Sequence, residues 1–194
     1  MSVIATRFDL DPALPFKYVG GDPAIDLVNT VDYLDGELVE ERLATYDGLT
    51  WWAEGAGVVT AAEGEALRGR AALDPTAARA AFEGALGFRA LLYRLFSAVA
   101  AGDVPSDLLT AFNATLAVAT ARLRVAEGGD AGLGWSWDGW SDALAAPLWP
   151  VVWSAARLIT SDEQRRIRVC GAGAKARRHY ARKRGATASP PPTP

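Results

Sequence analysis

Apolar residues recur at spacings of three and four along much of the chain, which is the pattern of helices that bury one face. In the first such stretch, Leu27, Val28, Val31 and Leu34 form an apolar stripe. The predicted helices cover residues 24–34, 75–101, 106–121 and 147–159, and two more begin at Asp47, with residues 55–57 closing the helix, and at Thr60.

Local signals mark where several of these helices begin. Asp22-Pro23 and Asp74-Pro75 each place an N-cap aspartate before a proline at the first helical position, where the missing N–H costs nothing. Thr60 and Glu63 have the spacing of a capping box. The other predicted N-caps are Asp47 and Ser106.

The pattern changes to alternation after residue 121. Leu123 and Val125 alternate with other residues, and so do Leu133, Trp135 and Trp137 beyond a glycine-rich loop. Two alternating segments around such a loop predict a β-hairpin, which needs another element to pack on. The predicted fold class is therefore mainly α (α+β), a multi-helix domain with a small β-hairpin.

The chain has seven tryptophans, most of them at helical or strand spacing. Tryptophans in such positions usually belong to the core, although an aromatic box for a cofactor is a second interpretation. Trp140 follows Asp138-Gly139 in a predicted loop, so we expect it to be the most exposed of the seven.

Charge is distributed unevenly along the chain. The net charge is −3, from 20 basic and 23 acidic residues. Residues 1–164 hold 11 basic and 23 acidic side chains and carry −12, whereas residues 165–194 hold nine basic side chains and no acidic one. An acidic body with a basic C-terminal arm is typical of a segment that binds polyanions. The alternative is a solvated tail that folds back on the acidic body.

Several functional classes are disfavoured by composition. A single Cys and a single His exclude an internal disulfide and leave Cys170 and His179 as the only N/S donors, short of the four that structural zinc needs. The sequence lacks a phosphate-binding glycine motif, a nucleophile elbow and H-E-x-x-H. We therefore expect no enzymatic activity; a hydrolase that uses carboxylates alone is the remaining enzymatic alternative.

Membrane and export signals are also not evident. No run reaches the roughly 18 apolar residues of a membrane span, and the first residues lack the apolar stretch of a signal peptide. We expect a cytoplasmic protein without a membrane partner.

Two separated motifs resemble a known family. Residues 20–30, GGDPAIDLVNT, are similar to the Gly-Gly…Leu-Asp-Phe-Val-Asn-Thr opening of the ABATE domain. Residues 166–170, RIRVC, and 174–180, AKARRHY, are similar to the two ends of the C-G-N-R zinc finger that follows that domain. The resemblance implies a bacterial stress-induced transcription regulator, and it spans nearly the whole chain in order.

The chain departs from this family pattern in the zinc finger. The family has four cysteines there, but here the two ends are joined through Cys170-Gly171-Ala172-Gly173. Cys170 is the only remaining family-type metal ligand, and it aligns with either the first or the last ligand. We therefore expect no metal and no cofactor, with the family's zinc lost. The expected organisation is an ABATE-like domain over 1–164, a finger remnant that forms a basic arm over 165–187, and a disordered tail over 188–194.

The first candidate site is the polar side of the first predicted helix. At helical spacing, Asp26, Asn29, Thr30 and Tyr33 share one face and are candidates for binding a small polar ligand. The structural alternative is that Asp26 and Asn29 satisfy backbone groups or hold the Gly20-Gly21 turn.

The second candidate site is the basic arm. Its residues could neutralise phosphates, and one tyrosine could stack on bases, which favours weak DNA binding with little sequence preference. The candidate nucleic-acid-binding residues are Lys175, Arg177, Arg178, Tyr180, Arg182, Lys183 and Arg184.

These features together predict a bacterial transcription or stress regulator. Its helical domain would sense a ligand or partner, its arm would contact DNA weakly, and a homodimer is a further expectation. The alternative is a stand-alone module that binds small molecules or proteins and has no DNA function.

Overall fold

The computed structural model describes residues 16–34, 37–127 and 132–168. Its helices are α2 (Pro23–Val28), α3 (Tyr46–Gly55), α4 (Ala61–Leu73), α5 (Pro75–Ala101), α6 (Ser106–Thr120) and α7 (Leu148–Thr160). Two short 3-10 turns are η2 (Trp140–Asp142) and η3 (Asp162–Arg166). Two antiparallel hairpins pair β1 (Val31–Leu34) with β2 (Glu37–Glu41) and β3 (Leu123–Glu127) with β4 (Leu133–Trp137). The predicted mainly α fold with a small β-hairpin is confirmed.

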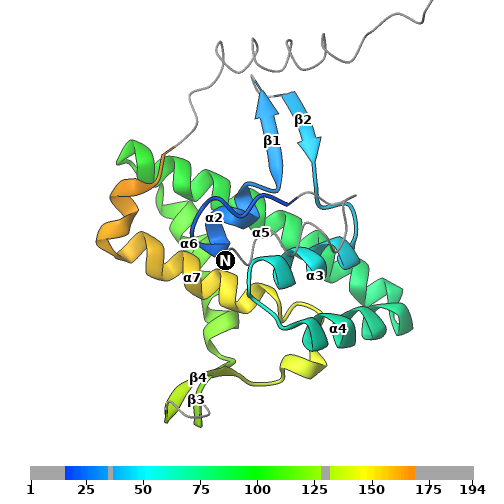
Figure 1. The fold of residues 1–194 in the computed structure, drawn as a ribbon. Coiled ribbons are helices and arrows are strands. Elements are labelled where there is room, and N and C mark those ends of the chain that lie inside the picture. The colour runs from blue at the N-terminus through cyan, green and yellow to red at the C-terminus, as the bar shows by residue number, and fades with distance from the viewer. Residues whose placement is uncertain (1–15, 35–36, 128–131, 169–194) are drawn as a thin grey trace, which may run out of the picture.

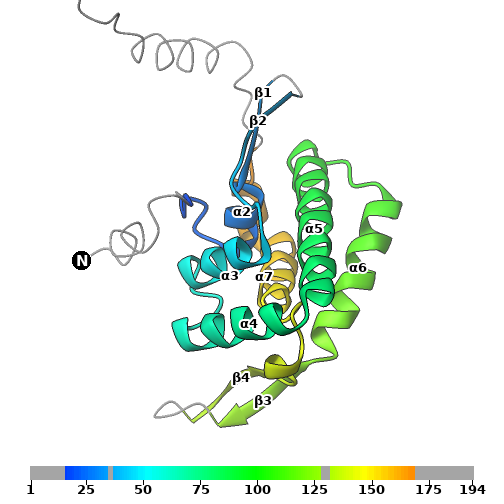
Figure 2. The same cartoon turned by 90° about the vertical axis from the view of Figure 1, so that its right-hand side faces the viewer.

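The long helix α5 is the centre of the body (Figures 1 and 2). It contacts α2, α3, α4, α6 and α7. In Figure 2, α6 lies on one side of α5, and α3 and α4 lie on the other. The two hairpins project at opposite ends of the helical body (Figure 1).

By length and composition α5 could also cross a membrane. Six of its seven buried residues, among them Leu92, Leu95 and Phe96, pack in the common hydrophobic core. The central helix of a helical body passes the same test as a membrane span, so this observation gives only weak evidence for a membrane.

The capping signals place several helix ends correctly. Asp22 and Asp74 cap α2 and α5 through their side chains, and each precedes a proline in the first turn. Thr60 and Glu63 form the reciprocal bonds of a capping box at α4. Gly102 ends α5 with a φ of 76°, a conformation that glycine adopts without strain.

Two predicted caps are wrong by one or two positions. The N-cap of α3 is Thr45, whose hydroxyl accepts from the Gly48 N–H, so Asp47 lies inside the first turn. The N-cap of α6 is Pro105, and Ser106 is the first helical residue without a capping bond. In each case an earlier residue starts the helix.

The helix predicted over 24–34 is wrong in its second half. It ends at Val28, and the chain continues as strand β1, which pairs with β2 from Val31↔Glu41 to Leu34↔Glu37. The apolar spacing of the stretch fits a helix, but a β-branched residue begins the strand and a partner strand lies nearby in sequence. The predicted helix stop, residues 35–36, lies outside the described residues.

The predicted hairpin of β3 and β4 is confirmed, and it packs through tryptophans. Leu123 pairs with Trp137 and Val125 with Trp135. The Trp137 ring contacts Trp149 of α7, with ring centroids 6.3 Å apart. The hairpin therefore has the supporting element that its stability requires.

The expectation for Trp140 is wrong. Its ring is half-buried and meets Trp149 edge-on at a centroid distance of 6.2 Å. Trp135, on the projecting hairpin, is far more exposed, with 67% of its surface accessible. The residue lies in a turn as predicted, but that turn folds over the end of α7.

Candidate functional site

The glycine pair before α2 is tied to that helix by a buried carboxylate. Asp26 is 6% exposed, and its Oδ1 accepts a 2.7 Å hydrogen bond from the Gly20 N–H. A Cβ on Gly20 would lie 2.5 Å from Cγ2 of Ile25, so the close approach requires glycine. Burial raises the pKa of Asp26, although backbone hydrogen bonds from Gly20 and Val19 oppose the change. Asp26 therefore holds the turn, as the structural alternative proposed.

Asp22 links the same turn to a distant helix. Its Oδ1 accepts from the Ala24 N–H at 2.8 Å, and its Oδ2 accepts from the Ser154 hydroxyl of α7 at 2.6 Å. The N-terminal cap of α2 is thus also a tertiary contact, and it fixes where α2 lies on the body.

Thr30 belongs to a buried polar network that joins three elements. Its hydroxyl donates to the Leu27 carbonyl at 2.7 Å and accepts from the Arg89 guanidinium of α5 at 2.9 Å. Arg89 also donates to both carboxylate oxygens of Glu41 in β2, at 2.8 and 2.5 Å. Burial would raise the pKa of Glu41, but the bonds from Arg89 and from the Leu43 N–H outweigh it and lower the pKa.

A second buried arginine anchors the β1–β2 hairpin. Arg42 is 4% exposed; it donates to the Asn29 carbonyl at 3.0 Å and to Asp32 and Glu40 at 2.5 Å each. Two carboxylates share one guanidinium, which fixes both strands to the end of α2.

The single helical face predicted for the four ligand-binding residues is not formed, because α2 ends at Val28. Asp26 and Thr30 are buried in the structural contacts described above, and Asn29 lies at the C-cap of α2. Tyr33 falls in β1, and its side chain lies outside the described residues. The predicted face is wrong because it required a helix through residue 33.

Arg89 was missed by the sequence reasoning, yet a signal for it exists. It lies at helical spacing from Ala85, Leu92 and Phe96, all buried residues of α5. A lone arginine on the apolar face of a core helix needs a buried partner. That rule could have identified Arg89, but nothing local identifies Glu41 as its partner, because 48 residues separate the two.

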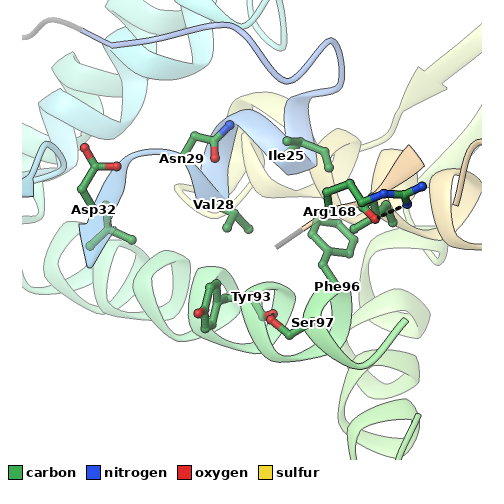
Figure 3. Close-up of a pocket in the computed structure, with 10 residues that line it drawn as sticks. Ile25, Val28, Asn29, Asp32, Tyr93, Phe96, Ser97 and Arg168 are labelled. Carbon is green, nitrogen blue, oxygen red and sulfur yellow. Dashed lines mark hydrogen bonds between the residues drawn. The ribbon is translucent and has the colours of Figure 1, made fainter. Parts of the chain in front are cut away.

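A cavity of about 220 Å³ opens next to this network, between α2 and α5 (Figure 3). Ile25 and Val28 line it from α2, and Tyr93, Phe96 and Ser97 from α5. The rest of the lining comes from Asn29, Val31, Asp32, Ile167 and Arg168. Its walls combine apolar side chains with an amide, a hydroxyl, a phenol and charged groups in nearly equal share, and small-molecule sites also combine apolar walls with a few polar groups.

The cavity also touches the last described part of the chain. Ile167 is 4% exposed, and Arg168 donates to the Ile167 carbonyl at 2.9 Å. Residues 167 and 168 lie near the start of the basic arm over 165–187. A molecule in the cavity would therefore contact the chain where the basic segment begins.

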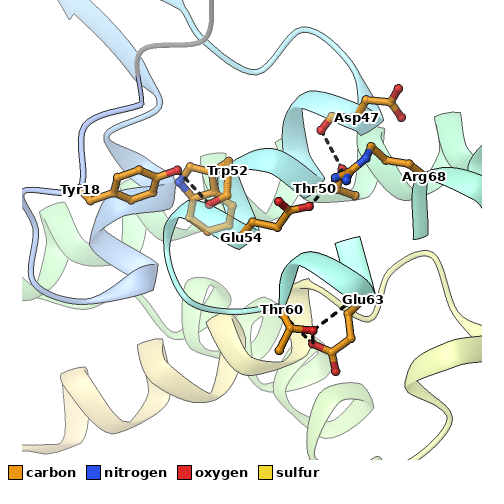
Figure 4. Close-up of polar contacts among 8 residues, drawn as sticks. All are labelled: Tyr18, Asp47, Thr50, Trp52, Glu54, Thr60, Glu63 and Arg68. Atoms are coloured by element: carbon orange, nitrogen blue, oxygen red, sulfur yellow. Dashed lines mark hydrogen bonds and ion pairs between the residues drawn. The ribbon is translucent and has the colours of Figure 1, made fainter. Parts of the chain in front are cut away.

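A second polar cluster joins α3 to α4 (Figure 4). Arg68 pairs with the buried Glu54 at 2.5 Å, and its guanidinium lies 5.6 Å from the Trp51 ring centroid. A Cβ on Gly64 would lie 1.9 Å from Oε1 of Glu54, so the two helices approach closely. Arg68 and Glu54 pair with each other inside the cluster, which supports a structural role for both side chains.

Within the described ranges no three Asp, Glu, His or Cys side chains are grouped to hold a metal ion. Cys170 and His179 lie outside those ranges. The finger implied by the family needs four N/S donors, and the chain has two in total. The donor set therefore does not fit the family's zinc.

The predicted nucleic-acid-binding residues, from Lys175 to Arg184, also lie outside the described residues. Their charge is a property of the sequence alone, and the structure leaves that prediction untested.

The fold and the site define a mainly helical domain with buried ion pairs and an open cavity between α2 and α5. The ABATE family model, described as "Putative stress-induced transcription regulator", matches residues 21–162. Because the match covers most of the chain, this protein belongs to the ABATE family. No curated protein and no solved structure matches the chain. The family description supports a regulator.

Proposed function

We propose that this chain is a bacterial, cytoplasmic transcription regulator whose helical body binds a small molecule and whose basic C-terminal sequence contacts DNA. The observation that carries the proposal is the position of the cavity: Ile167 and Arg168 form part of its wall and lie near the start of the basic arm over 165–187. A ligand in the cavity would fix the position of Ile167 and Arg168. If the ligand binds one arrangement of this segment more tightly than another, its binding is coupled to DNA contact by the basic residues that follow.

The proposed ligand has an apolar body and one or two polar groups. Val28, Phe96 and the ring of Tyr93 offer apolar contact, while the Asn29 amide and the Ser97 hydroxyl offer hydrogen bonds. The cavity volume limits the ligand to a small molecule.

The ligand proposal predicts stabilisation by small aromatic probes. Indole and phenol, each a ring with one donor, are expected to raise the melting temperature of the full chain at millimolar concentration, because they bind the folded state alone. Ser97→Trp, which fills the cavity, should abolish the shift, whereas Thr76→Trp, exposed on the same helix, should keep it. Thermal-shift measurements without any probe-dependent change in the wild type would contradict a binding cavity.

The DNA proposal predicts a steep salt dependence. Six neutralised phosphates give a slope of about −5 in log affinity against log salt, and three give about −3. We therefore expect the variant with Lys175, Arg177 and Arg178 changed to Gln to show the shallower slope in fluorescence anisotropy with duplex DNA. Matched changes on the body, at Arg79, Arg94 and Arg157, should leave the slope unchanged.

Two outcomes of that experiment would decide against the proposal. Absence of DNA binding at low salt would favour a stand-alone ligand or protein-binding module. Loss of binding in the presence of a chelator, or stoichiometric zinc in the purified chain, would show that a metal-dependent module contacts DNA, which contradicts a zinc-free arm.

A further inference from the structure

The cavity between α2 and α5 carries opposite charges at its two ends. Asp32 of β1 and Arg168, which follows η3, both line it, and in Figure 3 they lie at opposite ends of the labelled side chains. Val28 and Tyr93 lie between them in that view. A molecule that fills the cavity lengthwise would therefore meet a carboxylate at one end and a guanidinium at the other.

One edge of the Arg168 guanidinium has no partner among the described residues. Its Nη1 donates to the carbonyls of Arg165 and Ile167, whereas its Nε and Nη2 bond to nothing that the structure describes. Nε and Nη2 form the edge of a guanidinium that can donate two parallel hydrogen bonds to one carboxylate. Arg168 is thus equipped to hold an anion.

Other arginines near the cavity have their charge matched within the chain. Arg42 and Arg89 each bond to carboxylates at 2.5 Å, and Arg165, three residues before Arg168, pairs with Asp162 at 3.7 Å. No described carboxylate forms an ion pair with Arg168. Because Arg168 is exposed and exposed side chains change rotamer within nanoseconds, its unused edge can turn toward a molecule in the cavity.

The opposite end of the cavity offers a hydrogen-bond acceptor. Oδ2 of Asp32 accepts from Arg42 at 2.5 Å, but its Oδ1 accepts from no described residue. Glu40 shares the same guanidinium, so these three side chains together keep one net negative charge. An anion is therefore repelled from this end, and a hydrogen-bond donor is attracted to it.

We propose that the ligand of this cavity is an aromatic monocarboxylate with a hydrogen-bond donor on the far side of its ring. Its carboxylate pairs with Arg168, and its donor bonds to Asp32. Its ring lies against Val28, Phe96 and Tyr93. The volume of about 220 Å³ suits a single ring with two small substituents, because it is below the roughly 300 Å³ at which drug-sized sites begin. The inference rests on the proposed small-molecule function of this cavity and adds the chemical class of the ligand.

Four related probes test the assignment on the full chain in ligand-observed NMR titrations. The acid para-hydroxybenzoate has both groups in the proposed places, and para-hydroxybenzamide has the same shape without the charge. We expect the acid to bind about tenfold more tightly than the amide, because a bidentate pair with a guanidinium is stronger than neutral hydrogen bonds. Benzoate lacks the distal donor and salicylate has it beside the carboxylate, so both should bind about three- to tenfold more weakly than para-hydroxybenzoate.

The substitution Arg168→Gln removes the anion-binding edge. Affinity for para-hydroxybenzoate should fall about tenfold, to the level of the amide, whereas affinity for phenol should stay the same because phenol is neutral. The matched control Arg165→Gln removes the same charge three residues away, where the side chain is 82% exposed. It should leave both affinities unchanged.

Several results would overturn the assignment. Equal affinities of the wild type for the acid and the amide contradict an anion-binding end, and equally tight binding of inorganic phosphate shows a simple anion site without an aromatic ligand. If Arg168→Gln loses phenol as well, the substitution disrupts the cavity, and the comparison of acid and amide on the wild type decides the question. Binding of neutral probes with no preference for the acid contradicts the ligand class alone, whereas failure of every probe, indole and phenol included, contradicts the proposed function itself.

Discussion

Replacement of Arg89 by alanine is expected to lower the free energy of unfolding by about 2–4 kcal/mol, because it leaves Glu41 without its charged partner. Both carboxylate oxygens of Glu41 accept from this guanidinium, and the Arg89 side chain is only 8% exposed. Thr30 loses a hydrogen-bond donor in the same substitution. The contact between α5, the end of α2 and β2 weakens as a unit, and urea denaturation of the full chain measures the change.

The same helix offers a matched control. Arg79 of α5 also pairs with a glutamate, Glu83, at 2.8 Å, but both side chains are well exposed. Arg79→Ala should therefore leave the denaturation midpoint nearly unchanged, since exposed ion pairs are screened by water. Equal changes in the denaturation midpoint for the two substitutions would show that the Arg89 network stabilises the fold no more than an exposed ion pair does.

The double variant Arg89→Met with Glu41→Leu separates loss of a contact from the cost of an unpaired charge. We expect it to recover part of the stability lost in Arg89→Ala, because the Glu41 carboxylate, whose side chain is 30% exposed, is no longer left without its cationic partner. A double variant less stable than the single one would indicate that the bonds themselves stabilise the fold.

The parts of the fold that the sequence predicts well are those with signals at both ends. Helix α5 carries Asp74-Pro75 at its start and Gly102 after its end, and the predicted range of 75–101 is confirmed. The β3–β4 hairpin is similarly marked, since two alternating segments flank a glycine-rich loop. In both cases the relevant information lies within a few residues of the boundary.

The region from α2 to β2 could not be predicted in this way because its structure depends on distant partners. Residues 31–34 form a strand because β2 pairs with them and Arg42 fixes the junction. The periodicity of their apolar residues is compatible with a helix as well, and pairing decides between the two. The predicted helical face was built on that alternative and is wrong, while ligand binding by its residues stays a prediction.

The family motif over residues 20–30 is thus mostly a folding element. The Asp26 carboxylate accepts a hydrogen bond from the Gly20 N–H and so closes the turn. Asp22 caps α2 and accepts a hydrogen bond from the Ser154 hydroxyl of α7, and the Thr30 hydroxyl accepts one from Arg89. Motif identity on its own could not separate these structural roles from ligand binding, because both require polar residues on the same short segment. The cavity adjoins the motif through Ile25, Val28 and Asn29.

A loss of stability is also expected for Asp26→Ala, of about 1–3 kcal/mol, because the Gly20 N–H would lose its carboxylate acceptor inside the body. If Asp26 served a ligand instead, the alanine variant would keep its stability and lose only binding of the indole probe. Denaturation and thermal-shift measurements on one variant distinguish the two roles.

The pH dependence of Asp26→Asn tests the same assignment through a different quantity. Burial raises the folded-state pKa of Asp26, so the folded chain binds this proton more tightly than the unfolded chain. Stability from this group is full below the ordinary aspartate pKa of about 4 and is lost as pH rises through the folded-state pKa. Asparagine keeps an oxygen acceptor for Gly20 and does not titrate, so the variant should gain stability relative to the wild type between acidic and neutral pH. Urea denaturation of both chains across that range measures the difference, and parallel curves would show that Asp26 ionises in the fold as it does in water.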